Sequence, residues 1–423
     1  MSTIAVIGTS YVGLTTGAYL ARLGHRVVCA DIVVEKVERL RRGEIPIFED
    51  GLEDLVREGI DAGRLSFVVG GEAAVPGAEF VFLCVQTPQG DDGAADMTFI
   101  QAAAREIGPH LDPGSVVINK STVPVGSTRV VERALGRGDV AVVSNPEFLR
   151  EGTAVYDCLH PDRIVIGTDN HDAAVRVQGL FAGLDTPVII TDPASAETIK
   201  YAANAFLATK VSFVNAIANL CEAVGADAAD VVKGLGYDHR IGFEFLKPGP
   251  GWGGSCLPKD TRALIRIGDD AGYDFSLLRG VVAVNEEQFA RVVAKVVRLA
   301  RGAINGRVVA VWGLAFKART DDVRFSPALE VIRRLQARGA VVRAFDPAAT
   351  TDIAGVELCG DPYAACEGAD VLVVLTEWEE FAALDLDKVK AAMRSPTIVD
   401  ARNLLDADLA REKGFVYEGI GGP

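Results

Sequence analysis

Residues 3 to 13, Thr-Ile-Ala-Val-Ile-Gly-Thr-Ser-Tyr-Val-Gly, run from a short apolar segment into a turn that contains glycine. A helical pattern follows, Gly24 ends it, and a second apolar segment ends at Asp31. This order of strand, tight turn, helix and strand with a terminal carboxylate is typical of a dinucleotide-binding unit. The free N–H groups at the start of the helix bind a pyrophosphate, and the carboxylate binds ribose hydroxyls.

The details of this turn favour NAD. Asp31 repels a 2′-phosphate, which disfavours NADP. Ser10 stands where a second glycine is usual, so the backbone is expected to approach the phosphates less closely. A glycine turn without a cofactor is the alternative, and the spacing of Asp31 argues against it. We expect the cofactor to contact Gly8, Tyr11, Val12, Gly13, Asp31 and Lys36.

Short β-branched segments alternate with helical patterns through the first 192 residues, which predicts a doubly wound parallel sheet of the Rossmann type with helices on both faces. Strands are expected near residues 3–7, 26–30, 65–69, 81–85, 115–120, 140–144, 164–167 and 188–190. Asp192-Pro193 then starts a helix that no glycine or proline interrupts before Gly225. It spans roughly 48 Å at 1.5 Å per residue, a length typical of a bridge between domains or a dimer interface.

The rest of the chain predicts a helical segment and a second α/β domain. Residues 234–258 are rich in glycine and proline, and helical patterns resume from about 259 and over 276–300. Strands are expected near 307–312, 341–345, 370–375 and 397–400, with a helix that starts at Ser326-Pro327. The predicted organisation is a Rossmann-type domain (1–192), a central helical segment (193–300) and a C-terminal Rossmann-like domain (301–423).

Composition excludes several classes of protein. The 423 residues include 43 Lys and Arg against 58 Asp and Glu, a net charge of -15 that repels nucleic acid and anionic membranes. No apolar run approaches the roughly 18 residues of a membrane span, and the chain opens directly into a strand. The seven cysteines form no Cys-x-x-Cys pair, and the five histidines show no metal-ligand spacing. We expect a cytoplasmic enzyme without a bound metal.

The most reactive candidate is Cys256, within Gly253-Gly254-Ser255-Cys256-Leu257-Pro258-Lys259-Asp260. The preceding glycines let a substrate approach, while Lys259 and a following helix N-terminus stabilise a thiolate. A lone cysteine is more often an inert core residue. The charged, glycine-rich surroundings favour a nucleophile at Cys256 and at none of the other six cysteines.

Two further groups of polar residues favour a catalytic site. Lys200, Asn204 and Asn215 form a stripe along the predicted helix of 193–224, where a cation and an amide can hold an oxyanion. Glu147 and Glu151 follow a strand at the expected carboxyl edge of the sheet, where either can act as a general base. A solvated helix face and ordinary surface charges are the alternatives.

Several blocks in this order resemble the nucleotide-sugar 6-dehydrogenases, the UDP-glucose/GDP-mannose dehydrogenase family. The resemblance spans essentially the whole chain, through residues 8–13, 121–126, 145–152, 197–215, 249–260 and 313–327. It implies that a sugar C6 alcohol is oxidised twice, with two NAD per turnover, through a cysteine thioester that water hydrolyses. It also implies a homodimer whose active sites are shared between subunits.

The resemblance assigns roles to the residues that match the family pattern. Cys256 resembles the nucleophile, and Asp260, with Lys200 and a water held by Thr122, resembles the base. Glu151 resembles the group that activates water, while Lys200 and Asn204 steady the oxyanion. Further cofactor contacts are implied at Thr87, Thr122, Glu151 and Arg324. Substrate contacts are implied at Glu147, Phe148, Leu149, Lys200, Asn204, Arg240, Phe245, Lys247, Gly253, Phe316, Lys317 and Arg402, with Arg240 reaching the site of a neighbouring subunit.

The favoured substrate is UDP-glucose. The alternatives are GDP-mannose or another nucleotide sugar as the substrate, a two-electron hydroxyacid dehydrogenase, and a binding protein without catalysis. Leu257 also fits the GDP-mannose enzymes, whereas the pattern from Arg240 to Lys247 looks more like the UDP-glucose branch. A two-electron hydroxyacid dehydrogenase would need neither Cys256 nor the third domain. A binding protein that responds to NAD without catalysis would keep residues 8–31 but lose the cysteine or its partners.

Overall fold

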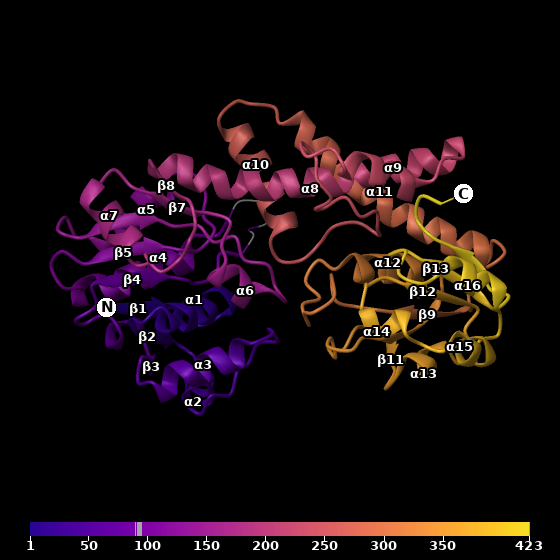
Figure 1. Cartoon of the computed structure of the whole chain (residues 1–423), viewed down its shortest axis with the longest axis horizontal. Coiled ribbons are helices and arrows are strands. Elements are labelled where there is room, and N and C mark those ends of the chain that lie inside the picture. Colours follow the sequence, from indigo (N-terminus) through magenta and orange to yellow (C-terminus); the bar gives the residue numbers. More distant parts are fainter. Residues whose placement is uncertain (89, 91–94, 423) are drawn as a thin grey trace. The chain divides into compact units, whose positions relative to one another are not determined.

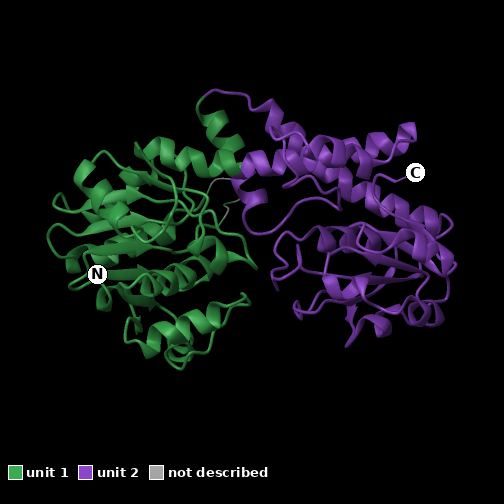
Figure 2. Cartoon of the chain, viewed as in Figure 1, with its two compact units in different colours: residues 1–203, 262–271 green, residues 204–261, 272–423 purple. Residues whose placement is uncertain are grey.

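The computed structural model describes residues 1–88, 90 and 95–422. The chain divides into two compact units, shown in green and purple in Figure 2. Unit 1 contains Met1–Ala203 and Arg262–Ala271, and unit 2 contains Asn204–Thr261 and Gly272–Pro423. The predicted division into three domains remains a prediction. None of the helices in the described residues is long and apolar enough to cross a bilayer.

Unit 1 is an α/β domain built on an eight-stranded sheet of order β3-β2-β1-β4-β5-β6-β7-β8 (Figure 1). Its strands are β1 Thr3–Ile7, β2 Arg26–Asp31, β3 Leu65–Val69, β4 Phe80–Leu83, β5 Val116–Asn119, β6 Ala141–Ser144, β7 Ile164–Gly167 and β8 Val188–Thr191. Its helices include α1 Tyr11–Arg22, α2 Val34–Arg41, α3 Leu52–Asp61, α4 Thr98–Ile107, α5 Ser127–Leu135, α6 Ala154–Leu159 and α7 His171–Gly179. The predicted doubly wound fold is confirmed.

The strands of this sheet are buried on both faces because side chains alternate between two cores. Ile4 and Val6 of β1 pack in the core that includes α1 and α3. Ala5 and Ile7 of the same strand pack in the core that includes α4 and α5. Burial on both faces explains why these segments are apolar runs rather than alternating patterns.

One strand pairing departs from the expected parallel sheet. β6 pairs with β7 in antiparallel fashion, with Ser144 opposite Gly167, and β8 is parallel to β7. The chain therefore does not cross back over the sheet after β6, and β7 begins at the edge where β6 ends. The whole connection that carries Glu147 and Glu151 consequently starts and ends at the carboxyl edge of β6.

Unit 2 combines long helices with a six-stranded parallel sheet of order β11-β10-β9-β12-β13-β14. Its strands are β9 Val308–Trp312, β10 Val341–Phe345, β11 Val356–Leu358, β12 Val371–Val374, β13 Thr397–Asp400 and β14 Val416–Glu418. Two helices are shared with unit 1: α8 Pro193–Val224, which starts there, and α10 Leu257–Asp270, whose residues from Arg262 onward belong to it. The other helices are α9 Ala228–Gly236, α11 Ser276–Leu299, α12 Pro327–Gln336, α13 Pro362–Cys366, α14 Glu379–Ala382, α15 Leu386–Ala392 and α16 Ala407–Glu412.

The bounds of α8 match the prediction, because Pro193 begins it and Gly225 follows it with a left-handed φ of 74°. The helix α11 shares a core with the C-terminal sheet, since Phe289 and Val292 pack in one cluster with Val309 and Val311. This shared core makes α11 and the sheet one compact unit.

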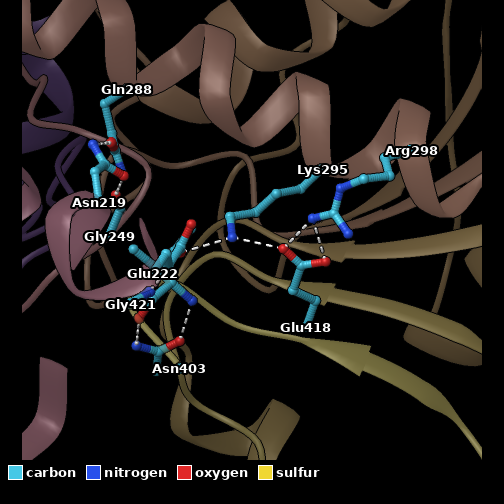
Figure 3. Close-up of polar contacts among 10 residues, drawn as sticks. Asn219, Glu222, Gly249, Gln288, Lys295, Arg298, Asn403, Glu418 and Gly421 are labelled. Carbon is cyan, nitrogen blue, oxygen red and sulfur yellow. Dashed lines mark hydrogen bonds and ion pairs between the residues drawn. The ribbon is translucent and has the colours of Figure 1, made fainter. Parts of the chain in front are cut away.

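A network of charges fastens the C-terminal strand to two helices of unit 2 (Figure 3). Lys295 of α11, only 7% exposed, donates to Glu222 of α8 at 2.7 Å and to Glu418 of β14 at 2.6 Å. Arg298 also binds Glu418, and Glu222 accepts the backbone N–H of Gly421. Lys295 therefore holds together two carboxylates from segments almost 200 residues apart.

This network generates a prediction about stability. Lys295→Ala should lower the free energy of unfolding by roughly 2 kcal/mol, because Glu222 and Glu418 lose their shared cation. Arg291→Ala on the exposed face of α11, where Arg291 pairs with Glu287, is the matched control and should change little. Thermal unfolding of the three proteins measures the difference. Equal midpoints for Lys295→Ala and the native protein would show that the network contributes no stability.

Candidate active site

The turn after β1 has the geometry of a pyrophosphate site. Gly8 has a left-handed φ of 96°, and a Cβ atom there would lie 2.8 Å from the carbonyl oxygen of Cys84. A Cβ atom at Gly13 would lie 1.9 Å from the carbonyl oxygen of Gly8, so α1 begins directly against the turn. The side chain of Ser10, the N-cap residue of α1, makes no capping hydrogen bond within the described structure. These features fit a dinucleotide at the start of α1, with Tyr11 and Val12 in its first turn.

The carboxylate of Asp31 lies at the end of β2, beside this turn. Its Oδ2 accepts hydrogen bonds from the Thr9 hydroxyl at 2.6 Å and from the Lys36 ammonium at 2.8 Å. Burial acts to raise the pKa of Asp31, but the bonds from Lys36, Thr9 and the Val33 amide outweigh it and lower the pKa. Asp31 is therefore ionised at neutral pH. Lys36, a predicted cofactor contact, is bound to this carboxylate.

Two threonines meet where neighbouring strands end. Thr87 follows β4 and is 8% exposed, and its hydroxyl donates to the carbonyl oxygen of Thr122, beyond β5, at 2.8 Å. Since β4 and β5 are adjacent and parallel, both residues lie at the carboxyl edge of the sheet. This is the edge at which doubly wound folds bind ligands.

A buried ion pair joins α8 to the loop after β6. The Lys200 ammonium lies 2.8 Å from Oε1 of Glu147, and the two residues are 3% and 6% exposed. Burial acts to raise the pKa of Glu147, but the charge of Lys200, the Leu149 amide and the charge of Lys120 outweigh it and lower the pKa. Glu147 is therefore an ionised partner of Lys200, which argues for a positioning role over general base catalysis.

Aromatic and apolar contacts complete the surroundings of this pair. The ring of Phe148 lies 5.5 Å from Lys200 Nζ, and the guanidinium carbon of Arg163 lies 3.6 Å from the ring centroid. Leu149 packs against the core on the α1 side of the sheet. The structure thus brings together Lys200, Glu147 and Phe148, three of the predicted site residues.

Lys120 also lies in this environment, although no motif marks it in the sequence. It is 8% exposed, and its ammonium donates to Oδ1 of Asn145 at 3.0 Å. Burial lowers the pKa of Lys120, and the charge of Lys200 lowers it further. Two buried ammonium groups, those of Lys200 and Lys120, therefore both stabilise the ionised form of Glu147. A lysine at the end of an apolar strand, immediately before Ser121-Thr122, was the available sequence signal.

In unit 2, Cys256 lies immediately before the first residue of α10. Its carbonyl oxygen accepts the backbone N–H of Asp260 at 2.9 Å, which places Asp260 one helical turn after the thiol. The Ser255 hydroxyl lies 3.6 Å from Cys256 Sγ. A thiol at a helix N-terminus has the local field that favours a thiolate.

Asp260 is fully buried and bound to two of its neighbours. Its Oδ2 accepts from the Asn204 amide at 2.6 Å, and its Oδ1 accepts from the Lys259 ammonium at 2.5 Å. Asn204 lies on α8 four residues after Lys200, so the two residues lie one turn apart on the same face of the helix. The Asp260 contacts therefore attach the Cys256 helix to α8 at the position of Asn204.

The glycine-rich loop before Cys256 fits tightly into unit 2. A Cβ atom at Gly253 would lie 2.1 Å from the carbonyl oxygen of Phe325, and one at Gly254 would lie 2.8 Å from the ring of Phe316. Asn215 accepts the backbone N–H of Gly249 at 2.8 Å. Asn215 therefore holds this loop in place through the backbone of Gly249. This structural role differs from the oxyanion binding that was considered for the stripe of Lys200, Asn204 and Asn215.

Three predicted substrate contacts come together after the strands of the C-terminal sheet. The Arg402 guanidinium donates to the carbonyl oxygens of Phe316 at 2.9 Å and Leu375 at 2.8 Å, and it pairs with Glu377. Lys317 Nζ lies 5.6 Å from the Phe316 ring centroid. These residues follow β9, β12 and β13, so they share the carboxyl edge of that sheet.

The remaining candidates are exposed or partly buried. Arg240 has a side chain that is 78% exposed and pairs with Asp238 at 2.5 Å, while the Arg324 side chain is 64% exposed and pairs with Asp322. Phe245 has a left-handed φ of 62°, an unusual conformation for an aromatic residue. Lys247 is exposed, and Glu151 is partly buried in the loop between β6 and α6. Within the described residues, no group of three or more His, Cys, Asp or Glu is arranged to hold a metal ion.

Comparison with known proteins finds the same family along most of the chain. Three models of the UDP-glucose/GDP-mannose dehydrogenase family match: its NAD binding domain at residues 2–185, its central domain at 194–287 and its UDP binding domain at 310–407. The NAD binding domain coincides with the turn and the carboxylate described above, and NAD is the cofactor.

Individual relatives match along their full length. The UDP-glucose 6-dehydrogenase TuaD of Bacillus subtilis is 46% identical over 100% of this chain and 94% of its own. A UDP-glucose dehydrogenase from Pyrobaculum islandicum is 39% identical with a TM-score of 0.92, covering 100% of this chain and 98% of its own. A GDP-mannose dehydrogenase from Pseudomonas aeruginosa is 30% identical with a TM-score of 0.55, covering 99% of both chains. The chain belongs to the UDP-glucose/GDP-mannose dehydrogenase family.

Proposed function

We propose that this protein is a UDP-glucose 6-dehydrogenase, which oxidises the C6 alcohol of UDP-glucose to the carboxylate of UDP-glucuronate. The observation that carries the proposal is the arrangement of Cys256, Asp260 and Asn204. A thiol at the start of a helix lies one turn from a buried carboxylate, which itself binds an amide of α8. This arrangement supplies a nucleophile, a base and a hydrogen-bond donor from two helices.

The choice of substrate rests on relatives and on the C-terminal domain. The relatives named for UDP-glucose are 46% and 39% identical to this chain, whereas the one named for GDP-mannose is 30% identical. Phe316, Lys317 and Arg402 share one sheet edge in a region that matches the UDP binding domain. The two cations there explain how a protein with a net charge of -15 binds a diphosphate.

In the first oxidation, Asp260 is the base that accepts the proton of the C6 hydroxyl, and the family pattern assigns Lys200 and Thr122 to the same step. Bound NAD supplies the hydride acceptor for both oxidations. The Lys200 ammonium and the Asn204 amide stabilise the negative charge that develops on the sugar oxygen. Glu147 holds the Lys200 ammonium in place through the 2.8 Å ion pair.

The second oxidation needs a covalent bond to the protein. The Cys256 thiolate adds to the C6 carbon of the aldehyde and forms a thiohemiacetal, which loses a second hydride and becomes a thioester. Glu151 then removes a proton from a water whose oxygen bonds to the acyl carbon. The C–S bond breaks, the electron pair returns to Cys256 as a thiolate, and the uronate carboxylate is released.

The sequence alternatives fit less well. A two-electron hydroxyacid dehydrogenase has no use for the match to a UDP binding domain over residues 310–407. A binding protein without catalysis would need neither Cys256 nor the acid-base residue Asp260 and its partner Asn204, which lie together in this chain. The cytoplasmic location expected from the cysteine pattern is part of the proposal.

The proposed dimer rests on an exposed apolar stripe of α8. Phe206, Phe213 and Leu220 lie seven residues apart and are 66%, 53% and 55% exposed. Val224, 67% exposed, continues the stripe to the end of the helix. Residues at this spacing share one helix face, and a second copy related by a twofold axis would bury them against the same stripe.

The first test measures stoichiometry. Each UDP-glucose consumed should yield two NADH, because the thioester route removes two hydrides before product leaves. Cys256→Ser should stop or drastically slow turnover and leave NAD binding nearly intact, since the cofactor turn lies in unit 1. Cys359→Ser, another partly exposed cysteine, is the matched control and should keep full activity. One NADH per sugar with free aldehyde, or full activity of Cys256→Ser, would contradict the mechanism.

The second test concerns cofactor choice. NAD should be preferred over NADP by about tenfold or more in kcat/KM, because the ionised Asp31 carboxylate at the end of β2 would repel a 2′-phosphate. Asp31→Asn keeps an acceptor for Thr9 and should reduce the preference. Equal use of both cofactors by the native enzyme, or an unchanged ratio in Asp31→Asn, would refute the ribose assignment.

The third test asks whether subunits share active sites. Arg240→Ala and Cys256→Ala proteins are each expected to be inactive, and mixing followed by exchange of subunits should restore activity to about a quarter of the native level. One of the two sites in a mixed dimer then has both residues intact. A mixture of Cys256→Ala with Cys256→Ser is the control and should stay inactive. No recovery despite verified exchange would place Arg240 in the site of its own subunit.

A further inference from the structure

A buried glutamate outside the proposed mechanism connects two parts of unit 1. Glu49 lies in the segment before α3 and is 8% exposed. Its Oε2 accepts the Tyr11 hydroxyl at 2.7 Å and the backbone N–H of Gly152 at 2.6 Å. Its Oε1 accepts the backbone N–H of Ala154 at 2.7 Å. The Glu49 carboxylate thus accepts three short hydrogen bonds from residues that are 38 to 105 positions away in the sequence.

The residues that Glu49 binds, Tyr11 and Gly152, are next to the dinucleotide turn and to Glu151. Tyr11 is the first residue of α1 and directly follows the turn that fits the pyrophosphate. The N–H of Gly152 belongs to the peptide bond that Glu151 forms with it. Glu49 therefore binds the backbone of the proposed water-activating residue and, through the same oxygen atom, a side chain at the dinucleotide turn.

The loop around Glu151 has a second anchor of a different kind. Oδ2 of Asp157 accepts the backbone N–H of Arg150 at 2.9 Å, and Oδ1 lies 2.5 Å from the Arg150 guanidinium. Asp157 is part of α6, the helix that directly follows the loop, so this anchor is local. Glu49 is the anchor that relates the loop to the cofactor turn.

The surroundings of Tyr11 fix its role as the donor in this contact. Burial raises the pKa of Tyr11 well above its usual value, and the hydrogen bond to Glu49 raises it further. The phenol therefore stays protonated and donates. Because breaking this bond would leave the Glu49 carboxylate, 8% exposed, without one of its donors, the contact constrains both segments.

We propose that Glu49 is a positioning residue that fixes Glu151 relative to the dinucleotide turn, so that thioester hydrolysis depends on it more than hydride transfer does. This inference rests on the proposed function, in which Glu151 activates water. A displacement of about 1 Å at such a group can cost about a hundredfold in rate. The first oxidation is less sensitive, because Asp260 and Lys200 have anchors of their own.

The test separates the two steps in the holoenzyme with saturating NAD and UDP-glucose. Stopped flow gives the rate at which the first NADH forms. Rapid quenching and intact-protein mass spectrometry give the fraction of enzyme that carries a uronyl adduct in the steady state. The variants are Glu49→Ala, which removes all three contacts, and Tyr11→Phe, which removes only the hydroxyl. Glu53→Ala, an exposed glutamate of α3 that pairs with Arg57, is the matched control.

Glu49→Ala should lower kcat by about tenfold or more and raise the adduct fraction, while the first NADH forms at a rate within about threefold of native. Tyr11→Phe should change the same two quantities in the same direction by a smaller factor, and it keeps the inference testable if Glu49→Ala does not fold. Glu53→Ala should match the native enzyme in both measurements.

Two results would overturn the inference. Either variant could slow both oxidations as much as hydrolysis, or Tyr11→Phe could leave kcat and the adduct fraction at native values. With a native enzyme that yields two NADH per UDP-glucose, these results refute the role of Glu49 alone. A native enzyme that yields no NADH from UDP-glucose refutes the proposed function and this inference with it.

Discussion

The buried carboxylate of Asp260 is the constraint on which the proposed chemistry depends. A fully buried carboxylate is costly unless donors surround it, and Asn204 and Lys259 meet this requirement at 2.6 and 2.5 Å. The contacts attach α10 to α8, and Cys256 lies one turn before Asp260. The need to satisfy this charge therefore fixes the thiol, the carboxylate and the amide as one group.

The same principle organises the site residues of unit 1. Glu147 is buried against Lys200, and Glu49 is buried against Tyr11 and two backbone N–H groups. Each carboxylate connects a loop at the carboxyl edge of the sheet to an element that arrives from elsewhere in the chain. The antiparallel pairing of β6 with β7 keeps the loop between them at that edge. Hydrogen bonds to buried carboxylates thus hold these loops in place, as backbone hydrogen bonds hold the strands of the sheet.

Much of this architecture was predictable because its signals are local. The turn at Gly8, the carboxylate of Asp31 and the bounds of α8 follow from glycine, proline and apolar spacing. The direction of β7 was not predictable, since an apolar strand has the same pattern in either direction. The strands β11 and β14 were missed because they are short, three residues each. Lys120 and Glu49 were missed because their partners lie 25 to 105 residues away and no motif marks the pairing.

The claim that most depends on this arrangement is the covalent intermediate on Cys256. A Glu151→Gln enzyme should still complete both oxidations but hydrolyse the thioester slowly, because the water loses its base. The most direct measurement is peptide mapping of this variant, quenched after mixing with NAD and UDP-glucose. The account predicts a uronyl group on the peptide that contains Cys256. An adduct on any of the other six cysteines, or no adduct while NADH is formed, would contradict it.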